Sequence, residues 1–329
     1  MIQKTKWFKR NLIIVLIIIV SINYVKADLL TSIRPLGFIA SAIADGITQT
    51  HVLLPNGASP HNYALKPSDI QRLHQADLVI WISPEMEVFL TKLTQQIDSH
   101  NNLILANVPT IHNLLIPGNN NDNIKLLKIK QSPQQHNNRS NIAITTHTIL
   151  EKYIHHHYSQ YNFHIWLSPI IAKSIAIAIH SKLLLQYPKN KNRLDINLRR
   201  FEETLQQTQK NIFLMLKPIH GKGYFVFHDA YSYFEKYFGL TPLGYLTINP
   251  EIQPGAYHLH KIRTQLAQPK VIFTEPQFRP AVISAIVQGT KIREGTLDPL
   301  GSSIALGADS YNKFLTQLSQ QYLSCLNRD

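Results

Sequence analysis

Short apolar runs alternate with amphipathic stretches from Leu29 to about Pro188. The runs have the length of buried strands, and the stretches between them repeat apolar residues at helical spacing. We predict strands at Leu29–Ile33, Val52–Leu54, Leu78–Ile82 and Leu103–Ala106, and helices at Gly37–Asp45, Pro67–His74, Met86–Ile97 and Pro169–Leu185. Strand–helix alternation of this kind predicts an α/β fold with a parallel sheet and right-handed crossovers.

A long helix is predicted over Lys189–Leu216, where apolar residues recur at spacings of three, four and seven. At 1.5 Å per residue its roughly 28 residues would span about 40 Å, which is long for one small domain and suited to joining two. Pro218 and Gly221 end the helix. Beyond it, strands are expected at Tyr224–Phe227, Leu243–Leu246, Val271–Thr274 and near Gly295–Leu297.

The chain of 329 residues is therefore expected to form two lobes, each with a parallel sheet flanked by helices, joined by one long rigid helix. We predict an N-terminal lobe at 28–188, a linking helix at 189–217 and a C-terminal lobe at 218–329. Residues 119–161 interrupt the first lobe with a segment rich in Asn and Gln that holds His136, His147 and His155–His157. Such a segment could bind metal weakly, or could be a loop drifting without selection.

The N-terminus has the pattern of a secretory signal peptide. Basic residues between Lys4 and Arg10 precede the apolar run Leu12–Val20, and Val25-Lys-Ala27 offers a cleavage site before Asp28. A retained membrane anchor is the alternative, but this apolar run is short, and no internal run reaches the ~18 residues of a membrane span. We therefore expect residues 1–27 to be a cleaved signal peptide and the protein to reside in the periplasm.

The charge of the chain does not indicate a nucleic-acid partner. The net charge is +13, and residues 1–27 carry five basic and no acidic side chains, which leaves +8 for the mature chain. The remaining basic residues are scattered, without the Lys/Arg stripe that is typical of nucleic-acid-binding proteins. Cys325 is the single cysteine, so no internal disulfide can form.

Three histidines lie where predicted elements begin or end, which is where open α/β sheets place their ligands. His228 follows the strand Tyr224–Phe227, and His61 follows a loop after the strand Val52–Leu54. His164 precedes the Trp-Leu-Ser-Pro step that begins a helix. Zinc favours four ligands in a tetrahedron, and neutral imidazole nitrogen is a preferred donor. Three imidazoles that converge from separate segments would form a metal site.

Seven sequence blocks in order resemble the zinc-uptake solute-binding proteins of bacterial ABC transporters. They are Arg34–Gly46, Gly57–Tyr63, Phe163–Pro169, Phe227–Tyr231, Asn249–Ala256, Thr274–Pro280 and Gly295–Gly301. The resemblance runs from about Asp28 to the C-terminus, apart from residues 119–161. It implies two α/β lobes joined by one stiff helix, with Zn²⁺ held between the lobes by His61, His164 and His228. It also implies transport without enzymatic activity, by delivery of zinc to a membrane permease powered by a cytoplasmic ATPase.

The fourth zinc ligand remains open between Asp298 and a water molecule. Some zinc members of the family have an acidic residue directly before the first histidine, but this chain has Pro60 there. Asp298, in the block Gly295–Gly301, matches an aspartate that ligates metal in other branches of the family. The resemblance therefore implies Asp298 as a ligand or a near neighbour of the metal.

Several other residues receive expectations from the same motifs. Glu275 and Arg279 are expected to fix a loop or a contact between lobes rather than to touch zinc. Asp229 could orient the adjacent histidine or stabilise the start of a helix. Family members often have a disulfide between the C-terminal helix and the strand before Glu-Pro-Gln-Phe; here Cys325 matches one half, but Val271 stands at the other.

The alternatives share the fold or the metal but differ in function. Manganese-binding relatives have a carboxylate at the position of His228, so a third imidazole favours zinc over manganese. An adhesin of the same fold, or a carrier of another divalent metal, would have the same site. A zinc hydrolase is a remote third possibility, because the sequence lacks His-Glu-x-x-His and a carboxylate at the spacing of a general base. We further expect a monomer.

Overall fold

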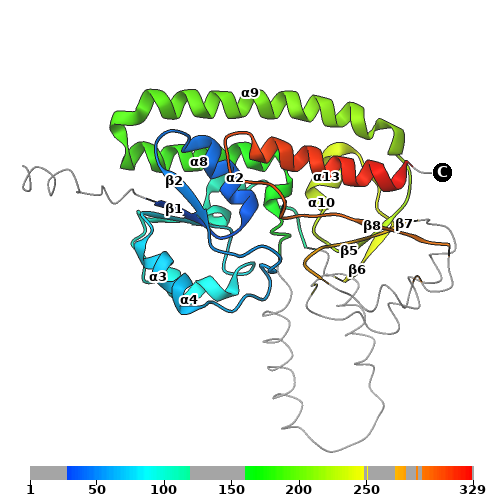
Figure 1. The fold of residues 1–329 in the computed structure, drawn as a ribbon, viewed down its shortest axis with the longest axis horizontal. Helices are drawn as coiled ribbons and strands as arrows, with labels where there is room; N and C mark the ends of the chain where they lie inside the picture. Colours follow the sequence, from blue (N-terminus) through cyan, green and yellow to red (C-terminus); the bar gives the residue numbers. More distant parts are fainter. Residues whose placement is uncertain are drawn as a thin grey trace, which may run out of the picture.

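The computed structural model describes residues 28–118, 160–247, 250, 271–278, 287 and 291–327. Two four-stranded parallel sheets lie side by side beneath one long helix (Figure 1). The predicted α/β fold with two sheet-containing lobes is thereby confirmed. Residues 1–27 and 119–159 lie outside the described residues, and so does Arg279.

The first sheet has the strand order β2-β1-β3-β4, with all three pairs parallel. Its strands are β1 (Asp28–Thr31), β2 (Gln49–Val52), β3 (Leu78–Trp81) and β4 (Asn102–Ile104), and its helices are α2 (Arg34–Ile43), α3 (Pro67–Gln75), α4 (Thr91–Thr94) and α5 (Pro109–His112). All four residues of the central strand β3 are buried, as expected for a parallel sheet covered on both faces.

The second sheet repeats this topology with the order β6-β5-β7-β8. Its strands are β5 (Phe225–His228), β6 (Gly244–Thr247), β7 (Val271–Thr274) and β8 (Arg293–Thr296), accompanied by α10 (Ser232–Phe238) and α13 (Ser310–Leu326). Gly239 ends α10 with φ +71°, a left-handed conformation that glycine adopts without steric cost. Because β5 pairs in parallel with β7, its last residue lies at the carboxyl edge of the sheet, next to the end of β7.

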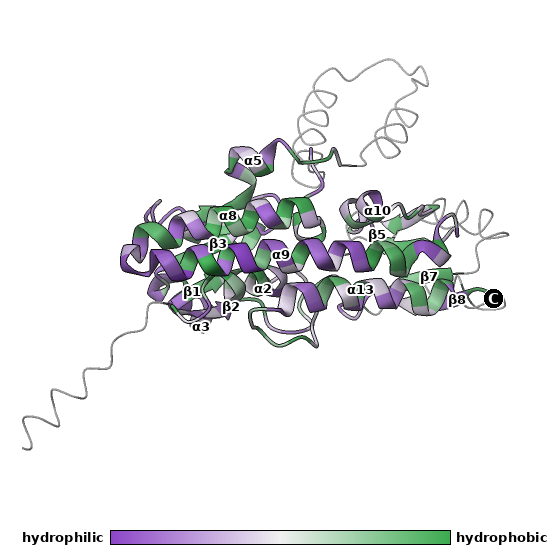
Figure 2. Cartoon of the chain, turned by 90° about the horizontal axis from the view of Figure 1, so that it is seen from above, coloured by the Kyte–Doolittle hydropathy of each residue, from purple (hydrophilic) through white to green (hydrophobic). Residues whose placement is uncertain are grey.

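The helix α9 (Lys191–Leu216) extends over both sheets, and α8 (Pro169–Gln186) and α13 lie against it (Figure 1). It buries Leu194, Phe201, Leu205, Ile212 and Leu216 along one face. Figure 2 looks down on α9 and shows a largely hydrophilic outer face. Most buried apolar side chains of the two lobes form one continuous cluster that runs from Leu29 to Leu326, and two smaller clusters cover the other face of each sheet. A shared core of this kind favours small tilts of the lobes over wide hinge opening.

Among the described helices, α8 alone is long and apolar enough to cross a membrane by length and composition. Its sequence includes Lys173 and Lys182, so it lacks a continuous apolar run. It packs against α2 and α9 and buries Ile171, Ile175 and Ile179 against the core. These contacts are those of a core helix.

The continuous helix predicted over Met86–Ile97 is wrong. The segment instead forms a turn of 3₁₀ helix at Val88–Leu90 followed by the four-residue α4. Glu87 leaves the helical conformation, with φ −118° and ψ 62°. Its buried Oε2 accepts hydrogen bonds from the backbone N–H groups of Ile82 (2.7 Å) and Ser83 (3.2 Å), at the end of the preceding strand. This side-chain contact with backbone groups four and five residues earlier competes with the helix that the apolar spacing predicts.

Candidate metal centre

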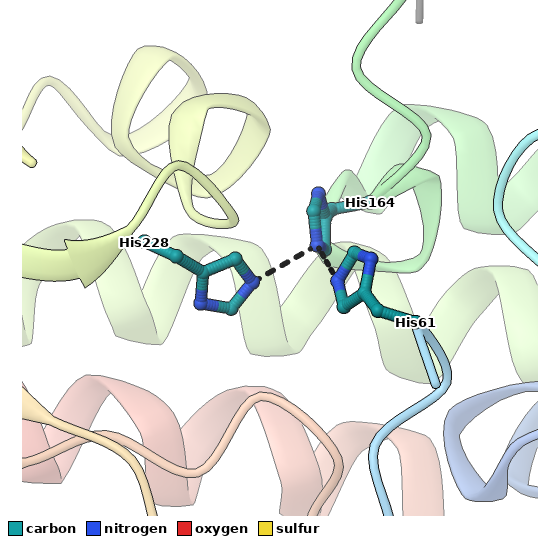
Figure 3. Close-up of side chains that lie close together, drawn as sticks. All are labelled: His61, His164 and His228. Carbon is teal, nitrogen blue, oxygen red and sulfur yellow. Dashed lines mark hydrogen bonds between the residues drawn. The ribbon is translucent and has the colours of Figure 1, made fainter. Parts of the chain in front are cut away.

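The three histidines that the sequence singles out lie together between the two sheets. His61 is on the loop after β2, His164 directly precedes the 3₁₀ turn Ile165–Leu167, and His228 is the last residue of β5. One ring nitrogen of each lies within 4.8 Å of the others. Figure 3 shows the three rings pointing toward one another from three separate segments.

Two of the three spacings between the ring nitrogens match the edges of a zinc coordination tetrahedron. The Nε2 atom of His164 lies 3.1 Å from Nε2 of His228 and 3.3 Å from Nε2 of His61, the two contacts drawn as dashed lines in Figure 3. For Zn–N bonds of about 2.0–2.1 Å, two nitrogens at tetrahedral positions lie about 3.3–3.4 Å apart. An ion of this size could therefore contact all three Nε2 atoms after only small shifts.

The opposite nitrogen of two of these rings faces a buried acceptor. His164 Nδ1 lies 2.8 Å from Oδ1 of Asn162, and His228 Nδ1 lies 2.5 Å from Oε1 of Glu275. The side chains of His228 and Glu275 are 3% and 2% exposed, so water does not compete for this contact. Each Nδ1 must carry the hydrogen, because a carbonyl or carboxylate oxygen only accepts.

This proton placement leaves the Nε2 lone pairs of His164 and His228 directed at the centre of the cluster. Two lone pairs at 3.1 Å repel each other unless a proton or a metal ion lies between them. Metal-binding histidines regularly donate the N–H of the opposite ring nitrogen to such an acceptor, since this bond fixes the tautomer and makes the ligand more basic. The geometry is therefore that of a site prepared for a cation.

The electrostatics favour a metal ion over protons on His61 and His164. Burial, together with the charge of the neighbouring His228, lowers the pKa of His61 to about 3. Burial, followed by the charges of His228 and His61, lowers the pKa of His164 well below its usual value. Both rings are neutral at physiological pH, which is the form that binds metal.

Asp298 does not lie among the ligand atoms that the three histidines bring together. Its Oδ1 accepts hydrogen bonds from Gln277 Nε2 (3.0 Å) and from the N–H of Leu300 (3.1 Å). Its Oδ2 accepts one from the N–H of Ser302 (2.6 Å). In this arrangement the carboxylate shapes the loop that follows β8.

Asp229 lies at the start of α10, where its Oδ1 accepts a hydrogen bond from the Ser232 hydroxyl at 2.5 Å. This contact favours its second expected role, at the helix start. The neighbour that contacts His228 is Glu275, which the sequence analysis assigned only to a loop or lobe contact. Asn162 was not singled out at all. Its position two residues before His164 was the available signal, because a side chain at that spacing can reach the ring in an extended segment.

Other histidines in the described part of the chain stand apart from the cluster. His180, for example, pairs with Asp195 at 2.8 Å, and exposed His100 pairs with Asp98 at 2.9 Å. The side chain of the single cysteine, Cys325, packs close to Gly295 of β8. The histidines between 119 and 159 lie outside the described residues.

Comparison with known proteins places this chain among zinc-uptake components. The family described as "Zinc-uptake complex component A periplasmic", ZnuA, matches residues 29–325. The high-affinity zinc uptake system protein ZnuA of Yersinia pestis is 53% identical over 329 residues, covering 99% of this chain and 100% of the relative. The protein of the same name from Buchnera aphidicola subsp. Schizaphis graminum is 36% identical over 328 residues, covering 99% and 97% of the two chains.

Solved structures support the fold independently. The periplasmic zinc-binding protein TroA from Treponema pallidum superposes with a TM-score of 0.69 at 16% identity. The match covers 92% of this chain and 100% of TroA. At this identity the likeness concerns the two-lobed architecture.

Proposed function

This chain belongs to the ZnuA family of periplasmic zinc-uptake components, and from that premise we propose that His61, His164 and His228 hold the Zn²⁺ that it carries. As a family member it is the zinc-binding component of a high-affinity uptake system, not an enzyme. Its partners are the permease and the ATPase of an ABC transporter, and it acts in the periplasm. The observation that carries the proposed site is the convergence of three imidazoles, with one ring nitrogen of each within 4.8 Å of the others and two Nε2 pairs at the spacing of a zinc tetrahedron.

We propose that water completes the tetrahedron in the arrangement described here. The carboxylate oxygens of Asp298 already accept hydrogen bonds from Gln277, Leu300 and Ser302. Direct ligation by Asp298, which the resemblance to other branches implies, would require it to give up part of this set. Asp298 lies two residues after the end of β8, on a loop. A rearrangement of this loop that brings the Asp298 carboxylate to the zinc ion is therefore the alternative to a water ligand.

Three neutral imidazoles favour zinc over manganese, which prefers hard oxygen ligands. Glu275 supplies negative charge to the site through His228 without contacting the ion. The site also lacks the organisation of a hydrolase, since this nearby carboxylate is engaged with a ligand histidine and is not placed as a general base. An adhesin of the same fold is disfavoured because the full-length relatives described above are zinc-uptake proteins.

The test is the number and affinity of metal ions bound to the chain from Asp28 to Asp329 after removal of metal. Zinc and manganese would be offered in turn against a competing chelator. We expect one tightly held zinc, lost in His228→Ala and His164→Ala and retained in His100→Ala, an exposed histidine outside the cluster. Asp298→Ala separates the two fourth-ligand arrangements: near-wild-type affinity supports water, whereas a loss comparable to His228→Ala supports direct ligation. Zinc binding indifferent to His228 would refute the site.

The processing and assembly of the protein are part of the same proposal. We propose that residues 1–27 are removed on export, at the cut before Asp28 that the sequence pattern predicts. The lobes at 28–188 and 218–329, joined by the helix at 189–217, would then form the mature monomer. The mass of the protein recovered from periplasm tests the cut, and light scattering tests the monomer.

A further inference from the structure

A single buried side chain connects a zinc-site histidine of one lobe with the backbone of the other. The Oδ1 atom of Asn162 accepts hydrogen bonds from Nδ1 (2.8 Å) and from the backbone N–H (3.0 Å) of His164. Its Nδ2 donates to the backbone carbonyl of Asp229 at 2.9 Å, one residue after His228. The same amide therefore sets the tautomer of His164 and fastens it to the chain that carries His228.

Asn162 is held in place by its own backbone. Its carbonyl accepts a hydrogen bond from the Tyr233 hydroxyl at 2.7 Å, and its N–H donates to the carbonyl of Ile116 at 2.9 Å. The Tyr233 hydroxyl also accepts from the N–H of Ile116 at 3.1 Å. The residue is only 7% exposed, so water cannot readily replace these partners. These contacts leave the side-chain amide of Asn162 one orientation, with its oxygen toward His164 and its nitrogen toward Asp229.

Apart from the contacts among the three rings themselves, two other interlobe hydrogen bonds of the described residues do not end on a ring of the histidine cluster. Trp166 Nε1 donates to the carbonyl of Pro299 at 2.8 Å, and Arg34 donates to the carbonyl of Ile304 at 2.8 Å. They hold the lobes together without fixing a metal ligand. Among the interlobe hydrogen bonds of the described residues, the bond from Asn162 is the one made by a side chain that also orients His164.

We propose that Asn162 is a positioning residue that couples the orientation of His164 to the relative position of the two lobes. While the lobes are together, the amide is fixed by Asp229 and holds His164 Nε2 toward the ion. A small displacement of the C-terminal lobe breaks the bond to Asp229 and frees the amide to turn. His164 then loses its fixed tautomer at the same moment as His228 moves away. Zinc is thus released by a lobe shift much smaller than the one needed to open the site.

The inference rests on the proposed zinc site, and two variants separate its parts. Asn162→Ala removes both the acceptor for His164 and the donor to Asp229. Asn162→Asp retains an acceptor for His164 Nδ1 but cannot donate to Asp229. Its added negative charge by itself slows zinc release, so faster release from this variant is a stringent result. Tyr311→Phe is the matched control, because it removes a buried hydrogen bond between the lobes, to the carbonyl of Trp166, that does not involve Asn162.

Three quantities are measured: zinc affinity by chelator competition, zinc dissociation by stopped flow, and the tautomer of His164 by imidazole NMR of the metal-free protein. We expect Asn162→Ala to weaken zinc binding by roughly 10- to 100-fold and to lose the single Nδ1–H tautomer. We expect Asn162→Asp to keep that tautomer but to release zinc about fivefold faster, the effect of one lost hydrogen bond. Tyr311→Phe should match the wild type in all three.

Two results would overturn the inference: release from Asn162→Asp no faster than from wild type, or equal changes in Tyr311→Phe and Asn162→Ala. The second result would mean that general loosening of the contact between the lobes explains the changes in zinc binding and release. The His164→Ala variant separates this inference from the proposed site. If that variant still binds zinc tightly, the site itself is wrong; if it loses zinc while the Asn162 variants behave as wild type, only the coupling is wrong.

Discussion

Replacing Glu275 by glutamine tests how much of the zinc affinity comes from a residue that does not touch the ion. Glu275 Oε1 lies 2.5 Å from His228 Nδ1, and both side chains are almost fully buried. Glutamine has nearly the same shape and can present its own carbonyl oxygen to Nδ1–H. The substitution therefore preserves the tautomer of His228 and removes the negative charge.

The magnitude follows from the geometry. A carboxylate oxygen at this distance from Nδ1 lies about 6.5 Å from a zinc ion bound at Nε2, given a Zn–N bond of about 2 Å. At an effective dielectric constant of about 20, one negative charge attracts a divalent ion at that separation by ~5 kcal/mol, which is an upper limit. Measured losses for such neighbours of metal ligands are typically 10- to 100-fold, or ~1.4–2.7 kcal/mol. We expect Glu275→Gln near the upper end of that range, because burial prevents water from replacing the charge.

The assay is zinc competition with a chelator at neutral pH, with thermal unfolding of the metal-free proteins as the test of folding. Glu235→Gln is the matched control, since it also converts a buried glutamate of the same lobe. Its Oε1 accepts hydrogen bonds from the Tyr224 and Tyr322 hydroxyls, and burial raises its pKa to about 8. It is mostly uncharged at neutral pH, so this control should leave zinc binding unchanged. Affinity of Glu275→Gln within about twofold of wild type, or equal loss in both variants, would refute the reasoning.

Three further predictions concern the stability of the fold. Because Glu235 has its pKa raised from 4.5 to about 8, the native state binds the extra proton between those values, and the free energy of unfolding should fall as pH rises through that window, by up to ~1.4 kcal/mol per pH unit. Urea unfolding at both ends of the window should show this slope and its reduction in Glu235→Gln; an unchanged slope in the variant would contradict the assignment. Gly301→Ala should cost about 2–3 kcal/mol, because Gly301 has φ +61° and an added Cβ would lie 2.9 Å from the rings of Phe38 and Phe314; a melting temperature equal to wild type would exclude this strain. Phe201→Ala should cost about 3–5 kcal/mol in urea unfolding, because Phe201 is 2% exposed on α9 within the shared core, and a loss below 1 kcal/mol would mean that the cavity collapses.

Local sequence patterns determined most of the elements. The buried strand β7 lies where it was predicted, at Val271–Thr274, and the linking helix begins two residues later than expected and ends at the predicted Leu216. Apolar runs and helical periodicity are formed by residues close together along the chain. A strand buried on both faces is a continuous apolar run, which is easily told from the spaced apolar residues of a helix. The continuous helix predicted over Met86–Ile97 failed because the Glu87 side chain binds backbone N–H groups four and five residues earlier, a contact that apolar spacing does not reveal.

The sequence also determined which residues could bind zinc. His61, His164 and His228 were recognisable because each lies where an element begins or ends and within a motif that resembles the family. Neither feature says how far apart their ring nitrogens lie. Only the packing of two sheets against one helix decided that three segments, spread over more than half of the chain, meet within 4.8 Å.

The tertiary structure alone decided what surrounds those ligands. Glu275 became the partner of His228 because β7 runs parallel to β5, which brings the ends of the two strands together. Asn162 became the connection to Asp229 because the segment before α8 meets the start of α10 across the lobes. These roles depend on angles, and on distances that must be correct to a few tenths of an ångström, between residues remote in sequence. Amino-acid identity fixes the chemistry that a side chain can offer, and the packed fold selects the partner to which it is offered.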